Sequence, residues 1–429
     1  MRKLLIMAFV TVFAISIQAQ SIREEIRQNI RCSASNHMAY PGPVQHRLTP
    51  APEGKKAFYI SHYGHCGSCY LTTPESYDVP YRVLAAADKQ GKLTTLGVDV
   101  FHRVKLIRDD ARQHWGELTS LGARQHQQIM RRMVDRFPEI FVEGTTIDAR
   151  STIEMRCIMS MENAMMQLMR MCPNVKVHHN ATRRDMYYLD QQDAYLDSLK
   201  KDGLGLGSYE ALCKENEDSR RLMRALFNDT AYIHRHVDVR ELNFALFELA
   251  SNIQNTDMRN TLTLYDLFTD NELYHNWRQV CAKWYITYGF TPLSGAIQPY
   301  SQRNLLHRII EQADSCIRQE RPNVHLRYGL ENVLLPLVCL LDINNYGYST
   351  IDLESLERHG WADYRICPMA ANVQFIFYRQ DPQDDDVLVK VLLNENEAML
   401  PVRSAIEPYY HWSDVRDYYL KKLKAYEKR

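Results

Sequence analysis

The stretch that decides the fold of this 429-residue chain is YISHYGHCGSCY, residues 59–70. It begins inside the apolar run Lys56–Ile60, which is typical of a short buried strand. Polar residues and a glycine follow at once in Ser61–Gly64 and predict that the strand ends there. Two histidines and two cysteines lie between His62 and Cys69. This density of nitrogen and sulfur donors makes the loop the centre of the sequence.

The composition excludes several classes of partner. Lys plus Arg equals 52 and Asp plus Glu equals 52, so no net charge directs the chain to nucleic acid or to an acidic surface. Arg2, Lys3 and the apolar run Leu4–Ile17 predict a signal peptide over residues 1–19, cleaved after Ala19. That run is too short for a membrane span, and no later segment approaches the required length. We expect an exported protein, periplasmic or extracellular.

The ten cysteines permit disulfides in an exported chain, but their density is far below that of a disulfide-stapled mini-protein. Cys157, Cys281 and Cys339 lie in apolar or helical settings, which predicts buried thiols. The sequence leaves the pairing of the other cysteines open.

Periodicity predicts alternating helices and strands at both ends of the chain. The predicted helices are 77–90, 121–137, 154–171, 305–319 and 333–341. The predicted strands are 139–142, 146–148, 175–179 and 324–328, with a hairpin formed by 373–378 and 387–393. Between them, residues 186–293 are almost all helical in pattern. We therefore expect an α/β domain from 20–180 and 300–429, with a helical cap inserted at 181–299.

The loop resembles the signature of the histidine acid phosphatases, in particular the branch similar to bacterial multiple inositol polyphosphate phosphatases. That family has Arg-His-Gly-x-Arg here: the histidine attacks phosphorus and the two arginines bind the phosphoryl oxygens. Gly67 and Ser68 fit this frame. His65, Cys66 and Cys69 stand where arginine, histidine and arginine belong.

Further stretches extend the resemblance along the chain in the family's order. Residues 118–126 resemble a Leu-Thr-x-x-Gly stretch that opens a helix. Residues 151–160 resemble the segment with a third phosphate-binding arginine, and Arg156 matches it. Residues 369–372 and the strands after them resemble the family's C-terminal hairpin.

The motif that supplies the family's second histidine and its acid falls in residues 326–332. In the family that histidine contacts the phosphate and the acid protonates the leaving oxygen. Leu330 occupies the histidine position. Glu331 occupies the acid position in one frame; in the other that position is Asn332, and the acid is lost.

The resemblance implies a phosphoglycerate-mutase-like, three-layer α/β sandwich with an inserted helical cap. It also implies a phosphomonoester substrate, foremost an inositol polyphosphate such as phytate, and no cofactor. Of the family's functional residues, only Arg156 and, in the first of the two frames, the carboxylate of Glu331 remain. Loss of a covalent nucleophile lowers a rate by about a millionfold. We therefore predict a pseudophosphatase; the alternative is an active, phytase-like phosphomonoesterase that uses other groups.

Several readings of the loop stay open. Cys66 as a replacement nucleophile would need an arginine after five residues, where Thr72 stands. His62, His65, Cys66 and Cys69 are weak candidates for a metal site. A Cys66–Cys69 disulfide, a redox role or simple loss of function are further alternatives.

Two residues outside the loop also allow two interpretations each. Arg156 is either an anion contact or an ordinary ion-pair residue. Glu331 is either a remaining acid or a negative side chain favoured at the start of a helix.

Overall fold

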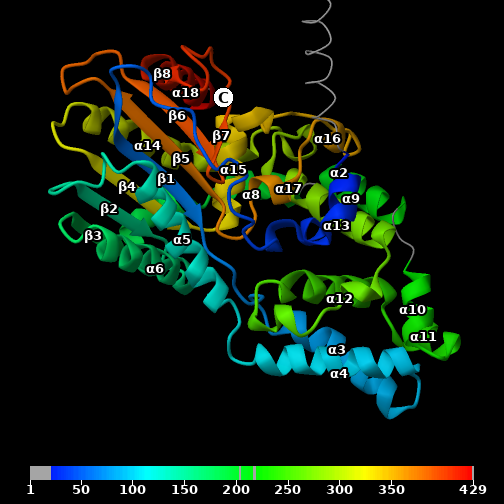
Figure 1. The fold of residues 1–429 in the computed structure, drawn as a ribbon. Helices are drawn as coiled ribbons and strands as arrows, with labels where there is room; N and C mark the ends of the chain where they lie inside the picture. Colours follow the sequence, from blue (N-terminus) through cyan, green and yellow to red (C-terminus); the bar gives the residue numbers. More distant parts are fainter. Residues whose placement is uncertain (1–20, 202–203, 216–218, 428–429) are drawn as a thin grey trace, which may run out of the picture.

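A mixed eight-stranded sheet forms the centre of the molecule, in the order β3-β2-β4-β1-β5-β6-β7, with β8 paired to β6 (Figure 1). Its strands are β1 Lys56–His65, β2 Thr146–Ser151, β3 Lys176–Ala181, β4 Asn323–Gly329, β5 Asn372–Arg379, β6 Leu388–Leu393, β7 Asn396–Ala398 and β8 Tyr410–His411. The computed structural model describes residues 21–201, 204–215 and 219–427. The predicted signal peptide, 1–19, lies outside the described residues. None of the described helices has the length and apolar character needed to span a membrane.

The strands β1, β4, β2 and β3 are parallel, whereas β5 runs antiparallel to β1 and starts the C-terminal hairpin. His65 pairs with Gly329, and Ser151 pairs with Tyr328. The carboxyl ends of β1, β4 and β2 therefore meet at one edge of the sheet. Ligands of open α/β sheets bind at such an edge.

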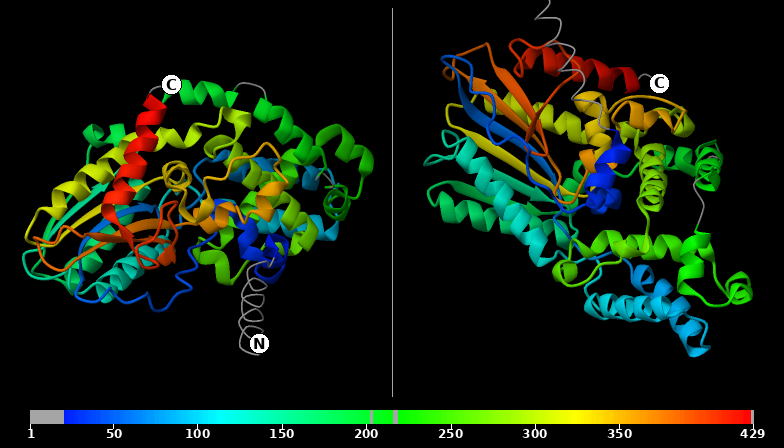
Figure 2. Two further views of the ribbon diagram at one scale, coloured as in Figure 1. Left: turned by 90° about the horizontal axis from the view of Figure 1, so that it is seen from above. Right: turned by 45° about the vertical axis from the view of Figure 1, so that its right-hand side comes forward.

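Alternate residues of the strands enter two different cores. On β5, Phe375 and Phe377 pack against α14 Arg303–Ile317, α15 Glu331–Leu341 and α18 Trp412–Glu427. Ile376 and Tyr378 face the other way, toward helices α5 and α6. The helices α5 Ser120–Arg136 and α6 Met155–Met171 cover that face. Figures 1 and 2 show the sheet between these layers, which confirms the predicted α/β sandwich.

A third core belongs to a group of helices beyond the carboxyl ends of β1, β4 and β2 (Figure 2). It contains α3 Glu75–Lys89, α4 Thr95–Asp110, α10 Arg220–Leu226, α11 Thr230–His236 and α12 Val239–Ile253. The next long helix, α13 Asp270–Tyr288, packs mainly in the core of the sheet domain. The helices within 181–299 thus divide between two cores, and one of these cores also takes two helices from residues 75–110. The predicted cap limits stay a prediction.

Two predicted strand boundaries differ from the structure. The prediction of a strand at 139–142 is wrong: these residues form a turn, in which Ile140 and Phe141 are buried for packing rather than for pairing. Strand β1 does not end at Ser61 but continues to His65, because β4 and β5 supply pairing partners on both sides. Backbone pairing on two sides stabilises a strand even where its sequence is polar.

Candidate active site

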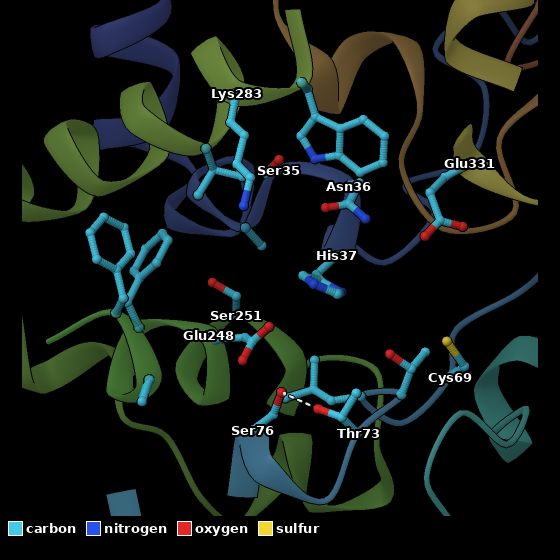
Figure 3. A pocket seen from close by; sticks show the side chains of 18 of the residues that line it. Ser35, Asn36, His37, Cys69, Thr73, Ser76, Glu248, Ser251, Lys283 and Glu331 are labelled. Atoms are coloured by element: carbon cyan, nitrogen blue, oxygen red, sulfur yellow. Dashed lines mark hydrogen bonds between the residues drawn. The ribbon is translucent and has the colours of Figure 1, made fainter. Parts of the chain in front are cut away.

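A cavity of about 750 Å³ opens at the carboxyl ends of β1 and β4. The loop after β1 and the start of α15 form one side of it, and α12 and α13 contribute further walls. A further wall comes from Ala34–His37 in the 3-10 segment η1 Ile30–His37, which the sequence had not indicated. Figure 3 shows Glu331 and Cys69 at one side of the cavity, away from Lys283 and Glu248.

Two glycines allow the loop to rest directly on the start of α5. A Cβ atom on Gly67 would lie 2.6 Å from the carbonyl oxygen of Gly122, and one on Gly122 would lie 2.3 Å from that of Ser68. Neither distance is possible without displacing backbone. Thr119, the N-cap residue, accepts from the Gly122 amide at the helix start. The glycines at these two family positions are thus explained by close packing.

Hydrogen bonds then fix the loop through its backbone. The Cys66 amide donates to the Gly329 carbonyl at 3.1 Å, and the Ala370 amide donates to the Cys66 carbonyl at 2.9 Å. The Gly67 amide donates to Ser160 Oγ at 3.1 Å. The Ser68 amide donates to Oε1 of the buried Gln125, and Gln125 Nε2 donates in return to the Ser68 hydroxyl oxygen, both at 2.9 Å.

The side chains of His65, Cys66 and Glu331 converge at the cavity edge. Their donor atoms lie within 4.8 Å of one another. His65 Nε2 lies 3.1 Å from Glu331 Oε2, and His65 Nδ1 lies 3.1 Å from the Pro368 carbonyl. His65 and Cys66 are fully buried, whereas Glu331 is 27% exposed toward the cavity.

This contact sets the protonation of the pair. Burial opposes the charge on His65, but the neighbouring Cys66 and Glu331 outweigh it and raise the pKa of the imidazole. Burial also opposes ionisation of Glu331, and the hydrogen bond and charge of His65 lower its pKa nonetheless. Glu331 is the first residue of α15, and its carboxylate lies against the His65 ring.

Three thiols meet beside this pair. The thiols of Cys157 and Cys69 neighbour the Cys66 sulfur, and with the nearby His65 charge they lower the pKa of Cys66. The Cys157 thiol donates to the Gly329 carbonyl at 3.2 Å. The hydrogen bond to Cys66 raises the pKa of Cys69, and burial raises that of Cys157. Cys66 and Cys69 are thiols in this structure, not a disulfide. The prediction of buried thiols at Cys157, Cys281 and Cys339 is confirmed.

Arg156 lines the same cavity from the first turn of α6. Its guanidinium lies 3.1 Å from Glu154 Oε2, and the side chain is 15% exposed. Burial opposes the positive charge of Arg156, but the neighbouring cysteines and Glu331 outweigh burial and raise the pKa of the guanidinium above its usual value. Arg156 is therefore both an ion-pair residue and a cation directed at the loop.

The structure separates the remaining sequence candidates. His62 does not line the cavity; its ring contacts Tyr328 within the sheet, so it is not part of the group around Cys66. The predicted set of His62, His65, Cys66 and Cys69 is thus corrected: among the described residues, Glu331 joins His65 and Cys66, and neither His62 nor Cys69 belongs to the group. Leu330 precedes α15 as its N-cap residue and has no polar side chain to offer.

The cavity also contains charged residues that sequence reasoning missed. Arg240 and Lys283 bring positive charge from α12 and α13, and Glu248 brings negative charge from α12. The Arg and Lys side chains of the lining are Arg156, Arg240 and Lys283, and its carboxylates are Glu75, Glu241, Glu248 and Glu331. Three Arg or Lys side chains against four carboxylates give no cationic excess. No local pattern distinguishes these residues from other charges on helix surfaces, so only the fold identifies them.

Comparisons with known proteins agree with this architecture. Residues 98–394 match the sequence profile of the histidine phosphatase superfamily (branch 2). Among curated protein sequences, none matches this chain.

Solved structures give the same fold. Multiple inositol polyphosphate phosphatase of Bifidobacterium longum in complex with inositol hexasulfate superposes with a TM-score of 0.76 at 16% identity, covering 90% of this chain and 96% of that one. Its complex with phosphate gives a TM-score of 0.74 at 15% identity, covering 91% and 98%. The phytase of D. castellii gives 0.68 at 13% identity, covering 92% and 85%. With the profile match over most of its length, this chain belongs to the histidine phosphatase superfamily, branch 2.

Proposed function

We propose that this chain is a pseudophosphatase, which binds a phosphorylated small molecule in its cavity and does not hydrolyse it through a phosphohistidine. One observation carries the proposal: Cys66 occupies the position where the resemblance places the nucleophilic histidine, at the end of β1. Leu330 stands in the place of the second histidine. A histidine nucleophile is thus replaced, although the surrounding loop is held in place by its backbone.

The charge of the cavity supports a ligand with few phosphates. Arg156, Arg240 and Lys283 can each contribute a charge-assisted hydrogen bond of about 1.5–3 kcal/mol to a phosphate. The four carboxylates of the lining oppose a densely phosphorylated ring. An inositol polyphosphate is the leading class, because a similar protein was solved with inositol hexasulfate. We further propose that the chain is exported, which rests on the predicted signal peptide at 1–19.

Hydrolysis is tested by phosphate release from para-nitrophenyl phosphate and phytate, from acidic to neutral pH, with a chelator present. We expect no turnover above that of buffer. A variant with His65→Arg, Cys66→His, Cys69→Arg and Leu330→His should gain turnover. Its matched control carries the same changes except at Cys66, and should stay silent because it lacks only the nucleophile. Turnover by the unaltered chain that disappears in Arg156→Ala and Glu331→Gln would contradict the proposal.

Binding is tested by calorimetry with an inositol monosulfate, which carries few charges and cannot be hydrolysed as a phosphate ester. Arg156→Ala should weaken binding by about 10- to 100-fold, the equivalent of one charge-assisted hydrogen bond. Arg170→Ala, at an exposed position on the same helix, is the control and should leave binding unchanged. Equal affinities of the two variants would show that Arg156 does not contact the ligand.

A further inference from the structure

We propose that His65, Cys66 and Glu331 form a zinc-binding site at the edge of the cavity. These residues offer one nitrogen, one sulfur and one oxygen ligand, and the three atoms lie within 4.8 Å of one another. Three protein ligands of these types, with one position left open, are typical of zinc sites that bind water or a ligand. The inference rests on the ligand geometry and does not depend on the proposed function.

The distance between two of the ligands fits a single ion. Two ligands bound at about 2.0 Å to a tetrahedral zinc ion lie about 3.3 Å apart. His65 Nε2 and Glu331 Oε2 lie 3.1 Å apart, so both can bind one ion with little movement. A zinc ion would take the place of the proton that now lies between them.

The orientation of His65 is also that of a metal ligand. Its Nδ1 lies 3.1 Å from the Pro368 carbonyl and donates its proton there, which directs Nε2 toward Cys66 and Glu331. In a histidine that binds a metal, the N–H of the other ring nitrogen almost always donates a hydrogen bond to an oxygen in this way. That contact fixes the tautomer and the ring plane.

The Cys66 sulfur has equivalent support. It lies beside the thiols of Cys69 and Cys157, and its own backbone is held by Gly329 and Ala370. Neighbouring donors of this kind stabilise a metal-bound thiolate. A thiolate and a carboxylate together neutralise the two charges of zinc, which favours binding at a buried position.

The fourth position of the ion would face the cavity. Cys66 and Glu331 line the cavity together with Arg156. An oxygen of an anionic ligand could bind there. The ion would then supply positive charge at a point where the chain lacks the two arginines that the family resemblance leads one to expect.

The test uses the full chain, freed of metal with a chelator and kept reduced with a phosphine. Titration with Co²⁺ should give one equivalent of a tetrahedral spectrum with a thiolate-to-cobalt charge-transfer band, and Zn²⁺ should displace it. Cys66→Ser should abolish the band. His65→Gln and Glu331→Gln should each weaken binding by about 100-fold or more. Circular dichroism establishes that each variant is folded.

Matched controls lie elsewhere in the chain. His179→Gln alters a second histidine–glutamate pair, with Glu162 at 2.8 Å, that lacks a cysteine ligand. Cys172→Ser removes a thiol that does not line the cavity. Both should bind cobalt like the unaltered chain.

Two outcomes would overturn the zinc site: no cobalt spectrum in the unaltered chain, or a spectrum that survives His65→Gln and Glu331→Gln and is lost in Cys69→Ser and Cys157→Ser. The second outcome would mean that thiols alone bind the metal. Metal binding and turnover are measured separately. Loss of the spectrum therefore contradicts only this inference, whereas phosphate release by chelator-treated protein contradicts only the proposed function.

Discussion

His62 illustrates how a single buried side chain can control the response to pH. It is 2% exposed, and its Nδ1 has no hydrogen-bond partner among the described residues. Burial, His126 and Arg327 lower its pKa from 6.5 to about 3. Because the pKa is lower in the folded state, the folded chain resists protonation, and stability present above pH 6.5 is lost as the pH falls.

We predict that a fall from pH 7 to pH 5 lowers the free energy of unfolding by about 2 kcal/mol through His62. Over this range only the unfolded chain gains the proton on this residue. Urea unfolding of His62→Gln at both pH values should show a correspondingly smaller difference. His178→Gln, at an exposed strand position, is the control and should keep the full difference. An unchanged pH dependence in His62→Gln would show that other groups cause it.

At the residue scale, the sequence was most informative where chemistry and chain position coincide. His65, Cys66 and Cys69 could be singled out because a dense group of donors follows directly after a strand. Glu331 could be named, but its contact with His65 depends on the register between β1 and β4. Arg240 and Lys283 could not be found, because they reach the cavity only through the packing of helices distant in sequence.

At the scale of elements, the contact between the loop and α5 is the most demanding one in the site. Gly122 lies inside α5, where alanine is favoured over glycine by about 1 kcal/mol. A Cβ there would nevertheless lie 2.3 Å from the Ser68 carbonyl oxygen. The steric effect and the helix propensity therefore have opposite signs, and an experiment can separate them.

We predict that Gly122→Ala destabilises the chain by about 1–3 kcal/mol, because backbone must move to admit the methyl group. Gly207→Ala is the matched control: it lies inside α9 Leu204–Glu215, and no atom lies within 4 Å of its Cβ position. It should stabilise the chain by up to about 1 kcal/mol. Urea unfolding curves give both values, and a stabilising Gly122→Ala would refute the close contact.

The element boundaries show why periodicity alone was sufficient for α5 and insufficient at 139–142. The α5 pattern repeats over several turns and begins at a capping threonine, so tertiary contacts only add to it. Residues 139–142 have apolar side chains, but four residues do not distinguish a strand from a buried turn. The short strands β7 and β8 likewise form only because β6 offers them a partner.

For the molecule as a whole, the two sides of the cavity belong to different cores. The loop and α15 are attached to the sheet, whereas α12 is attached to the separate group of helices. The sequence predicted a helical unit but placed it in one continuous segment. Residues 75–110 join it through buried side chains such as Val100, which shares a core with Leu246 of α12. Contacts between segments so distant in sequence leave no local signal.

We predict that these cores can be destabilised separately. Leu246→Ala, at a fully buried position of α12, should cost about 2–5 kcal/mol and increase hydrogen exchange chiefly in α3, α4 and α12. Leu392→Ala, fully buried on β6, should instead increase exchange in the sheet. Mass spectrometry of peptide fragments measures both patterns. Equal increases throughout the chain for either variant would show a single cooperative unit.

The backbone bonds that hold the loop after β1 have a consequence for how this protein can change. Gly329, Ala370, Ser160 and Gln125 fix its path, and none of these bonds uses the side chains at 65, 66 or 69. The backbone path of the loop therefore does not depend on the side chains that determine its chemistry. Lineages can replace the reactive groups while the fold persists, and a combinatorial library at these three positions would sample new chemistries on an unaltered frame.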